Sequence, residues 1–439
     1  MNTYVFDSST QKKLFISFGI GVLLLVLGIF FSGSSKTKEE HTSVAKTEIV
    51  AKGSNNESTD THEAEAGHGH HAEASVGLLV KANIYSLFYF GFYIAIAALF
   101  FLSATNIAWG GWQVSFQKIP LAISTTVVFF LICLFTMFIF FKHDIFEWTH
   151  DYLYDPKDPR FDALLALKHG DFLSMNWFWS FNIVIAVSAV FLVYKWWKTL
   201  TEMDTNPSLK LFSSSRLFAA ISIVVISFVI NTFATWYWSM SIQPHWYSTM
   251  YTWNTMAGAA VTMLSIVIIL IHFLKSKGYL PNVNVNHEHD VAKLMFAISV
   301  FWMYTFFSQY MLIWYANIPE ETEFFRLRRN TDNYGFLFHF AIICNFVLPF
   351  FILMKRNSKR SRTATLIAAF IIIFGQFAWF FLMNCPMLLP KDGFGIVSIG
   401  LLLMIGSIFG YLVLTMLSKI KDLESSTHPY VKESYKHHI

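Results

Sequence analysis

Ten apolar stretches, each long enough to cross a lipid bilayer, divide this chain of 439 residues. A membrane-spanning helix needs about 20 predominantly apolar residues. Only 14% of the residues are charged, against roughly 25% in an average soluble protein. The sequence therefore predicts an all-α polytopic membrane protein. The ten stretches cover residues 14–32, 84–106, 119–141, 176–197, 215–240, 250–274, 291–315, 333–354, 363–385 and 394–417.

The helix count suggests two four-helix bundles, built from helices 2–5 and 6–9, with the first and last helices at the periphery. We divide the chain into an N-terminal transmembrane anchor (1–32), a polar linker rich in His and Glu (33–78), a nine-helix membrane domain (79–417) and a polar tail (418–439). The linker has too few apolar residues to fold alone.

Lys and Arg residues indicate the orientation, because they accumulate on the cytoplasmic side. The side that holds both termini carries 19 of them and the other side 13, of which 5 fall in the long first loop. Long loops cross regardless of charge, so both termini are predicted to be cytoplasmic. The net charge of +4 gives no reason to expect a nucleic-acid partner.

The sequence carries no pattern for a redox cofactor or a strong metal site. Cys133, Cys344 and Cys385 are isolated, and no Cys-x-x-Cys-His motif for haem attachment is present. The His-rich stretch 62–73 could bind a transition metal weakly, but a solvated linker is the favoured interpretation. His143, Glu147 and His150 could share one helical face, and we favour a hydrogen-bonded polar cap over a metal site.

An aromatic and polar segment ends the fifth stretch and gives a candidate quinone or lipid pocket. Trp238, Gln243, His245 and Trp246 combine apolar rings with groups that could bond a quinone oxygen. A histidine can also take or give a proton near pH 7. The simpler interpretation is an aromatic belt at the membrane interface.

The seventh and eighth stretches carry candidates for a proton path. Tyr304, Ser308 and Gln309 place hydroxyl and amide groups on neighbouring faces of one helix. His339 lies within the eighth stretch and is expected to face the bundle interior, because ionisable groups in membranes rarely face lipid. With His245 near the outer end, these residues form the predicted path. Hydrogen bonding between helices is the alternative.

Three segments together resemble one protein family. They are Glu147-Trp-Thr-His150 with Asp162-Ala-Leu-Leu-Ala-Leu-Lys168, then Pro244-His-Trp-Tyr-Ser-Thr-Met-Tyr251, and Ser308-Gln-Tyr-Met-Leu-Ile-Trp-Tyr-Ala-Asn-Ile-Pro-Glu-Glu321. They are similar to the ten-helix F subunit of alternative complex III, the bacterial quinol:cytochrome c oxidoreductase. The family usually has His where this chain has Leu167, and Tyr-Leu-Asn after the Lys, where Phe172-Leu173-Ser174 stands nearby.

The resemblance implies an assembly in the bacterial inner membrane. The expected partners are multihaem and monohaem cytochrome c subunits, an iron–sulfur subunit, a second polytopic subunit that binds quinol, and in some assemblies a terminal oxidase. The F subunit has no redox centre, so haem c and iron–sulfur clusters belong to partners, while quinone and phospholipid are expected ligands. Its proposed roles are structural support, quinone or lipid binding and proton conduction. The predicted partner-docking residues are His150, Asp162, Lys168, Glu320 and Glu321.

Two alternatives remain for the function. The chain could be a structural anchor for cytochrome subunits, in which case its interior would be dry and fully packed. It could also be a secondary transporter, which often has Gly- or Pro-broken helices at mid-membrane. Most prolines here lie in loops or at helix ends, with Pro349 the main exception, and this weakens the transporter interpretation.

Overall fold

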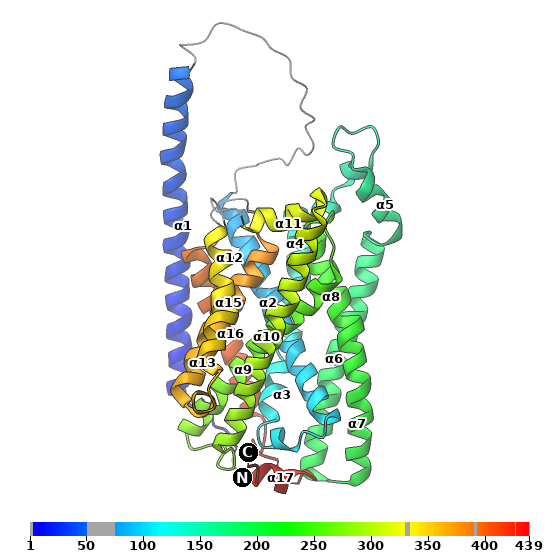
Figure 1. The fold of residues 1–439 in the computed structure, drawn as a ribbon, viewed down its shortest axis with the longest axis vertical. Helices are drawn as coiled ribbons and strands as arrows, with labels where there is room; N and C mark the ends of the chain where they lie inside the picture. Colours follow the sequence, from blue (N-terminus) through cyan, green and yellow to red (C-terminus); the bar gives the residue numbers. More distant parts are fainter. Residues whose placement is uncertain (1–2, 51–74, 330–333, 390–392, 426, 439) are drawn as a thin grey trace.

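The computed structural model describes residues 3–50, 75–329, 334–389, 393–425 and 427–438, and within these ranges it is built from helices with no β-strand (Figure 1). Ten of the helices are long and apolar enough to cross a membrane. Each overlaps one predicted stretch, so the prediction of an all-α polytopic membrane protein is confirmed. The His-rich stretch 62–73 lies outside the described residues.

The spans and the short helices follow one another along the chain. The ten spans are α1 (Ser8–Val50), α2 (Val76–Ile107), α3 continued by α4 (Lys118–Ser124, Val127–Ile145), α6 (Met175–Thr205), α7 continued by the π-helical turn η4 and α8 (Leu209–Val224, Val225–Ile230, Asn231–Trp238), α9 (Thr249–Ser276), α10 (Val285–Ala316), α12 continued by the π-helical turn η6 and α13 (Gly335–Ile342, Ile343–Val347, Leu348–Leu353), α15 (Arg362–Asn384) and α16 (Ile396–Ser418). The short helices are η1 (Gly111–Ser115), η2 (Glu147–Thr149), η3 (Asp151–Tyr154), α5 (Ala163–Asp171), η5 (Met240–Ile242), α11 (Pro319–Arg329), α14 (Arg356–Arg360) and α17 (Val431–Tyr435).

The spans pack as two groups of four and one outer pair. The first group contains α2, α3–α4, α6 and α7–α8, and the second contains α9, α10, α12–α13 and α15. The groups meet where α2 contacts α9 and α15. Within α2, 83% of the apolar window is buried, and Ala95, Ala97 and Ala98 let neighbouring helices approach closely.

The outer pair is α1 and α16, which lie side by side (Figure 1). Glycines let their backbones approach: a Cβ atom on Gly21 would lie 2.7 Å from the carbonyl oxygen of Gly400. The membrane-spanning part of α1 includes Ser8–Phe31. The helix itself continues to Val50, through Lys, Glu and Ala residues that favour helix.

Both ends of the described chain lie at one end of the molecule, here called the terminal face; the other end is the opposite face (Figure 1). Thr3 Oγ1 donates to the carbonyl oxygen of Lys421 at 2.5 Å, and Tyr4 packs edge-on against Tyr279. The α5 and α11 helices lie at the opposite face. With an even number of spans both termini lie on the same side of the membrane, and their placement in the cytoplasm stays a prediction.

The segments 419–425 and 427–438 form a folded C-terminal cap over the terminal face. Lys118, only 2% exposed, places its Nζ 2.6 Å from Asp204 Oδ2 and also donates to the carbonyl oxygen of Asp422. Gln117 donates to Ser425 Oγ at 3.0 Å, and Asn282 Nδ2 donates to Glu424 Oε2 at 2.6 Å. The polar tail is therefore docked in the described structure, through hydrogen bonds to the start of α3 and to the connection between α9 and α10.

Candidate functional site

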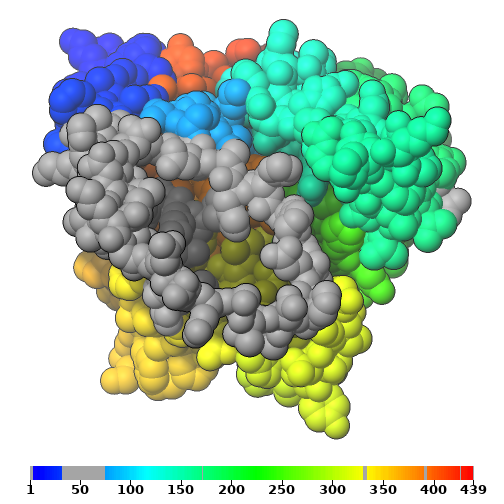
Figure 2. Space-filling view, turned by 90° about the horizontal axis from the view of Figure 1, so that it is seen from above, coloured from blue at the N-terminus to red at the C-terminus, as the bar shows by residue number. Residues whose placement is uncertain are grey.

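Three segments meet at the opposite face: α5, α11 and the aromatic loop, defined here as Ser239–Ser248, which joins α8 to α9. The α5 region and α11 stand at different edges of this face (Figure 2). The aromatic loop contacts both, as the side-chain bonds below show. These are parts of the three segments on which the family resemblance depends.

Bonds from α5 hold one side of the aromatic loop. Asp162 caps the N-terminus of α5 and places Oδ2 2.7 Å from His245 Nε2. Lys168, in the last turn of α5, donates to the carbonyl oxygen of Pro244 at 2.6 Å. Burial lowers the pKa of Lys168. Two residues predicted to dock a partner therefore make contacts within the chain.

An aromatic stack holds the other side of the loop. The rings of Trp246 and Phe324 are parallel, with centroids 3.6 Å apart. The guanidinium carbon of Arg328 lies 3.3 Å from the Phe324 centroid. Because two groups this close cannot share one face of a ring, Trp246 and Arg328 must enclose Phe324 between them. This stack fixes α11 against the aromatic loop.

Arg328 is a fully buried cation, 1% exposed. Its nitrogens donate to Gln243 Oε1 at 3.3 Å and to the carbonyl oxygens of Phe324 and Met383, each at 2.7 Å. Burial lowers its pKa to about 9. Met383 belongs to the last turn of α15, where unpaired carbonyl groups carry partial negative charge. Arg328 therefore joins α11, the aromatic loop and the end of α15.

A cavity of about 300 Å³ opens between α5, α8 and the aromatic loop. It has aromatic walls, and Lys168 is the charged side chain among the described residues that line it. Trp246 is the one predicted pocket residue that lines it. Trp238 is instead part of the aromatic core and donates to Asn182 Oδ1 at 2.5 Å. The lining residues are Lys168, Phe172, Leu173, Trp236, Met240, Ser241, Pro244, Trp246, Tyr247, Ser248 and Thr249.

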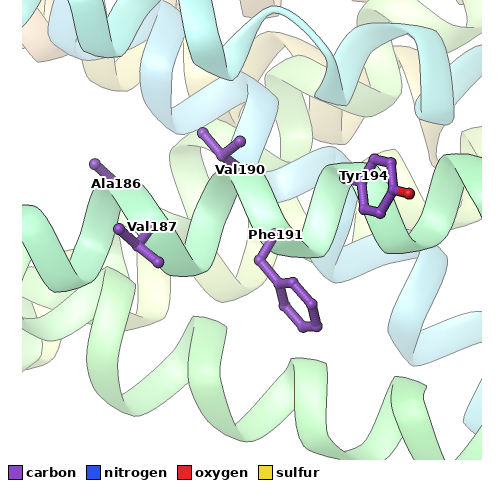
Figure 3. Close-up of a pocket in the computed structure, with 5 residues that line it drawn as sticks. All are labelled: Ala186, Val187, Val190, Phe191 and Tyr194. Atoms are coloured by element: carbon purple, nitrogen blue, oxygen red, sulfur yellow. The ribbon is translucent and has the colours of Figure 1, made fainter.

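A second, shallow depression lies on the outer surface of α6 (Figure 3). Ala186, Val187, Val190, Phe191 and Tyr194 line it, and the Tyr194 hydroxyl is its single polar group. Four of these side chains are more than two-fifths exposed. Such a surface suits lipid chains and offers no groups for catalysis.

The structure separates the residues of the predicted proton path. His339 lies on an exposed surface of α12, so the expectation that it faces the bundle interior is wrong; its Nδ1 lies 2.7 Å from the carbonyl oxygen of Gly335. Tyr304 is 61% exposed, and Ser308 beside it donates to the Tyr304 carbonyl. Gln309 is buried. These residues have the predicted helical spacing on α10, but the hydroxyl groups of Tyr304 and Ser308 lie on the outward-facing side of the helix.

A buried polar seam runs instead between α9 and α15. Ser239 Oγ lies 2.6 Å from the Tyr251 hydroxyl and 2.5 Å from Asn384 Oδ1. One turn deeper, Asn254 Oδ1 accepts from the Trp379 indole at 3.1 Å. These residues connect the aromatic loop with the membrane interior.

Gln376 continues the seam on α15. Its side chain is fully buried against Gly258, and neither amide atom has a hydrogen-bond partner among the described residues. Near the terminal face, His272 Nε2 lies 3.1 Å from Thr365 Oγ1, and its Nδ1 lies 3.9 Å from Glu288 Oε1. The seam therefore has polar groups at both membrane boundaries and in between.

The polar cap after α4 is not a single helix. Because α4 ends at Ile145, the predicted helical face through His143, Glu147 and His150 does not form. His150 Nε2 lies 3.0 Å from the His143 carbonyl oxygen, and His143 Nδ1 lies 3.1 Å from Thr149 Oγ1. No group of three metal-binding side chains is found in the described ranges. The hydrogen-bonded cap is the better description.

Several acidic side chains remain exposed at the opposite face. Glu147 and Asp151 are exposed beside α5, and Glu320 is exposed at the start of α11. Glu321 and His150 are half-buried. The docking prediction therefore stays open for His150, Glu320 and Glu321.

Sequence reasoning missed the burial of Arg328 and the central place of Asn254. Arg328 stands four residues after Phe324, so helical periodicity already put it on the apolar face of α11. Arg326 on the same helix instead pairs with Glu323 at 2.5 Å and stays exposed. No family model matches this chain, and neither does any curated protein.

Proposed function

We propose that this chain is an integral membrane subunit of a respiratory quinol:cytochrome c oxidoreductase of the alternative complex III type. It has no redox centre of its own and lies in a bacterial inner membrane with the terminal face in the cytoplasm. The observation that supports this proposal most is spatial. Two of the family-like segments, far apart in sequence, join through Asp162–His245 and Lys168–Pro244, and the helix α11, which begins at the end of the third segment, joins the same surface through Trp246–Phe324.

The opposite face then serves as the docking surface for the haem-bearing and iron–sulfur partners. Its exposed acidic groups Glu147, Asp151 and Glu320 offer contacts to Lys and Arg side chains of a partner, next to exposed cations such as Arg326. The Arg328 stack and the α5 bonds make this surface rigid, which suits a permanent interface. The cavity beside Lys168 is the place where a quinone ring would fit, between Trp236 and Trp246 with the Lys168 ammonium as a donor.

The proposal predicts that c-type haem co-purifies with the chain. After gentle extraction from its native membrane, the preparation should show a c-type haem spectrum and quinol:cytochrome c activity. The three isolated cysteines cannot hold such haem, so the spectrum must come from partners. Replacing Glu320 and Glu321 by lysine should lower the haem-to-protein ratio roughly tenfold, because the docking surface would repel a basic partner.

Glu202→Lys is the control, since the Glu202 side chain is 46% exposed at the terminal end of α6 and, among the described residues, pairs with Lys198. It should leave the haem ratio unchanged. A folded preparation with neither haem nor activity would refute the complex and favour the transporter. If the variant with lysine at Glu320 and Glu321 keeps the full haem-to-protein ratio, α11 is not part of the interface with the haem-bearing partner.

Proton conduction is a second role that the polar seam supports. Buried amides without protein partners, such as that of Gln376, are sites where water can complete the hydrogen bonds. Chains of hydroxyls, amides and water can carry protons between the His272–Glu288 end and the Tyr251 end. This route replaces the predicted path through Tyr304, Ser308 and His339, which face outward.

We expect Gln376→Leu to reduce the proton yield per quinol at least several-fold while the complex still assembles. Leucine fills a similar volume but cannot bond water, so the hydrated route should be interrupted. The measurement is pH change in vesicles that contain the purified complex. His339→Gln is the control and should keep the full yield; an equal loss in both variants would reject the seam as the route. If Gln376→Leu keeps the full proton yield per quinol, the alternative of a structural anchor with a dry, fully packed interior is favoured.

A further inference from the structure

The outer surface of α5 is apolar, although this helix is not one of the ten spans. Leu164 and Leu167, one helical turn apart, are 56% and 72% exposed. The sequence from Ala163 to Gly170 contains one charged residue, Lys168, and its Nζ donates toward the aromatic loop, to the carbonyl oxygen of Pro244. A helix that faces water carries polar or charged side chains on its outer surface. The outer surface of α5 therefore calls for apolar surroundings.

The inner side of α5 is already occupied by the protein. Leu165 is buried, and Asp162 and Lys168, near the two ends of the helix, both bond to the aromatic loop. The helix cannot roll to bury its exposed leucines without breaking both bonds. Leu164 and Leu167 therefore face whatever surrounds the described chain.

The contacts of Phe172, the residue after α5, set the level of the helix relative to the membrane. The Phe172 ring stacks on Tyr237 with centroids 4.8 Å apart, and its centroid lies 6.3 Å from that of Phe181. Tyr237 belongs to the last turn of α8, and Phe181 to the second turn of α6. The α5 helix therefore lies level with the ends of these spans, and Figure 1 shows it beside the end of α6.

The adjoining span α6 has a surface that faces lipid. Ile183, Val184 and Val187 are each more than half exposed, and because α6 is one of the candidate membrane spans, they contact lipid chains. Trp177, in the first turn of α6, is also exposed, and Trp at the end of a span is typical of the membrane interface. Only residues 172–174 separate α5 from α6, so α5 stands at the edge of this lipid-facing surface.

The turn before α5 has the opposite character. Arg160 Nη2 lies 3.0 Å from Asp158 Oδ2, and the Arg160 guanidinium carbon lies 3.8 Å from the centroid of the Tyr152 ring. Lys157 is exposed in the same turn. This charged turn extends further from the spans than α5 does (Figure 1). The segment thus has charges on the side away from the spans and apolar side chains at the level of their ends.

We propose that α5 is a membrane-surface helix whose Leu164 and Leu167 insert among the lipids of the leaflet at the opposite face. Helices of this kind bury their apolar face about 5–10 Å into the boundary between headgroups and acyl chains. Because Asp162 and Lys168 tie α5 to the aromatic loop, the lipid surface then supports one wall of the cavity beside Lys168. The proposal does not depend on the respiratory assignment.

The test uses the full chain with its own three cysteines replaced and Leu167→Cys labelled with an environment-sensitive fluorophore. The protein is reconstituted in vesicles of phosphatidylcholine that is brominated near the headgroup end of its acyl chains. The label should emit at shorter wavelength than in water, and the brominated lipid should quench it at least several-fold more than a label at Lys157→Cys. Adding Leu164→Glu, which places a carboxylate beside the label, should reduce the quenching by more than half.

A label at Glu323→Cys is the helical control, because the Glu323 side chain is 46% exposed on α11 at the same face. It should behave like the label at Lys157. If the label at Leu167 is quenched no more than these two, α5 faces water and the proposal is wrong.

The same label is also read after gentle extraction from the native membrane with any attached proteins and reconstitution in the same lipid. Quenching in both preparations supports insertion into the leaflet. Quenching that is present in the isolated chain but lost in this preparation would mean that a partner protein covers Leu164 and Leu167, and would overturn the proposal.

Discussion

Replacing Arg328 by alanine should lower the free energy of unfolding by about 3–5 kcal/mol, the largest effect we expect from a single side chain. The change removes donors from Gln243 Oε1 and from the carbonyl oxygens of Phe324 and Met383. These acceptors are buried and have little access to water. The substitution also removes the guanidinium group that stacks on the Phe324 ring, and such a contact is strongest where water is excluded.

Two further substitutions separate the hydrogen bonds from the charge. Arg328→Lys keeps a cation, but a single ammonium cannot replace the planar fork, so a loss close to that of alanine is expected. Arg328→Met removes the cost of burying a charge and fills much of the volume, so its loss should be roughly half as large. This order would show that the bonds to three segments, rather than the charge, stabilise the opposite face.

The measurement is unfolding in mixed detergent micelles, followed by tryptophan fluorescence. Arg326→Ala is the control on the same helix: Arg326 is 76% exposed in its side chain and pairs with Glu323. Surface pairs of this kind contribute about 0–1 kcal/mol. If Arg328→Ala changes the free energy of unfolding by less than about 1 kcal/mol, the bonds of Arg328 to the three segments do not stabilise the opposite face.

Placing leucine at both Gly21 and Gly400 should separate α1 from α16 while the other spans stay folded. A Cβ atom at Gly21 would lie 2.7 Å from the Gly400 carbonyl oxygen, and one at Gly400 would lie 2.7 Å from the Leu25 nitrogen. Both contacts are with backbone, so the helices must move apart. Overpacking of this kind costs about 1–3 kcal/mol per site, and helices in lipid gain little hydrophobic energy to offset it.

Disulfide formation between cysteines placed at Leu14 and Gly410 measures this separation, in a chain whose own three cysteines are replaced. A Cβ atom at Gly410 would lie 3.4 Å from the Leu14 side chain, so the pair should cross-link efficiently. The yield should fall at least several-fold in the Gly21 and Gly400 double variant. Gly19→Leu with Gly406→Leu is the control, because neither Cβ atom would meet any atom within 4 Å. An unchanged yield in the first variant would show that α1 is held elsewhere.

The spans could be predicted from the sequence because membrane solvation acts on each one separately. A run such as 250–274 must be helical in lipid whatever its neighbours do, and α9 occupies Thr249–Ser276. The rotation of each helix depends instead on which neighbours it meets. Tyr304 and Gln309 differ by five residues on α10, yet one is 61% exposed and the other 4%. Periodicity gives their angular separation but not which side faces inward.

The candidate site was harder to predict for the same reason. The segments around Asp162, His245 and Glu320 could be recognised individually, and the structure joins the first two by a 2.7 Å contact. The burial of Arg328 depends on the end of α15, more than fifty residues further along the chain. Local sequence carries no signal for such a partner, and a charged side chain is exposed by default.

The pairing of α1 with α16 also constrains the order in which the protein is made. Residues 8–31 enter the bilayer before the other nine spans of the described residues, but the surface that receives Gly21 does not exist until residue 400 has been synthesised. During the intervening insertion events α1 lacks this main partner, although it can already contact α2. Its glycine-lined surface therefore has to be compatible with a long stay in the membrane before α16 is made, and the docking of α1 against α16 must be among the last folding steps.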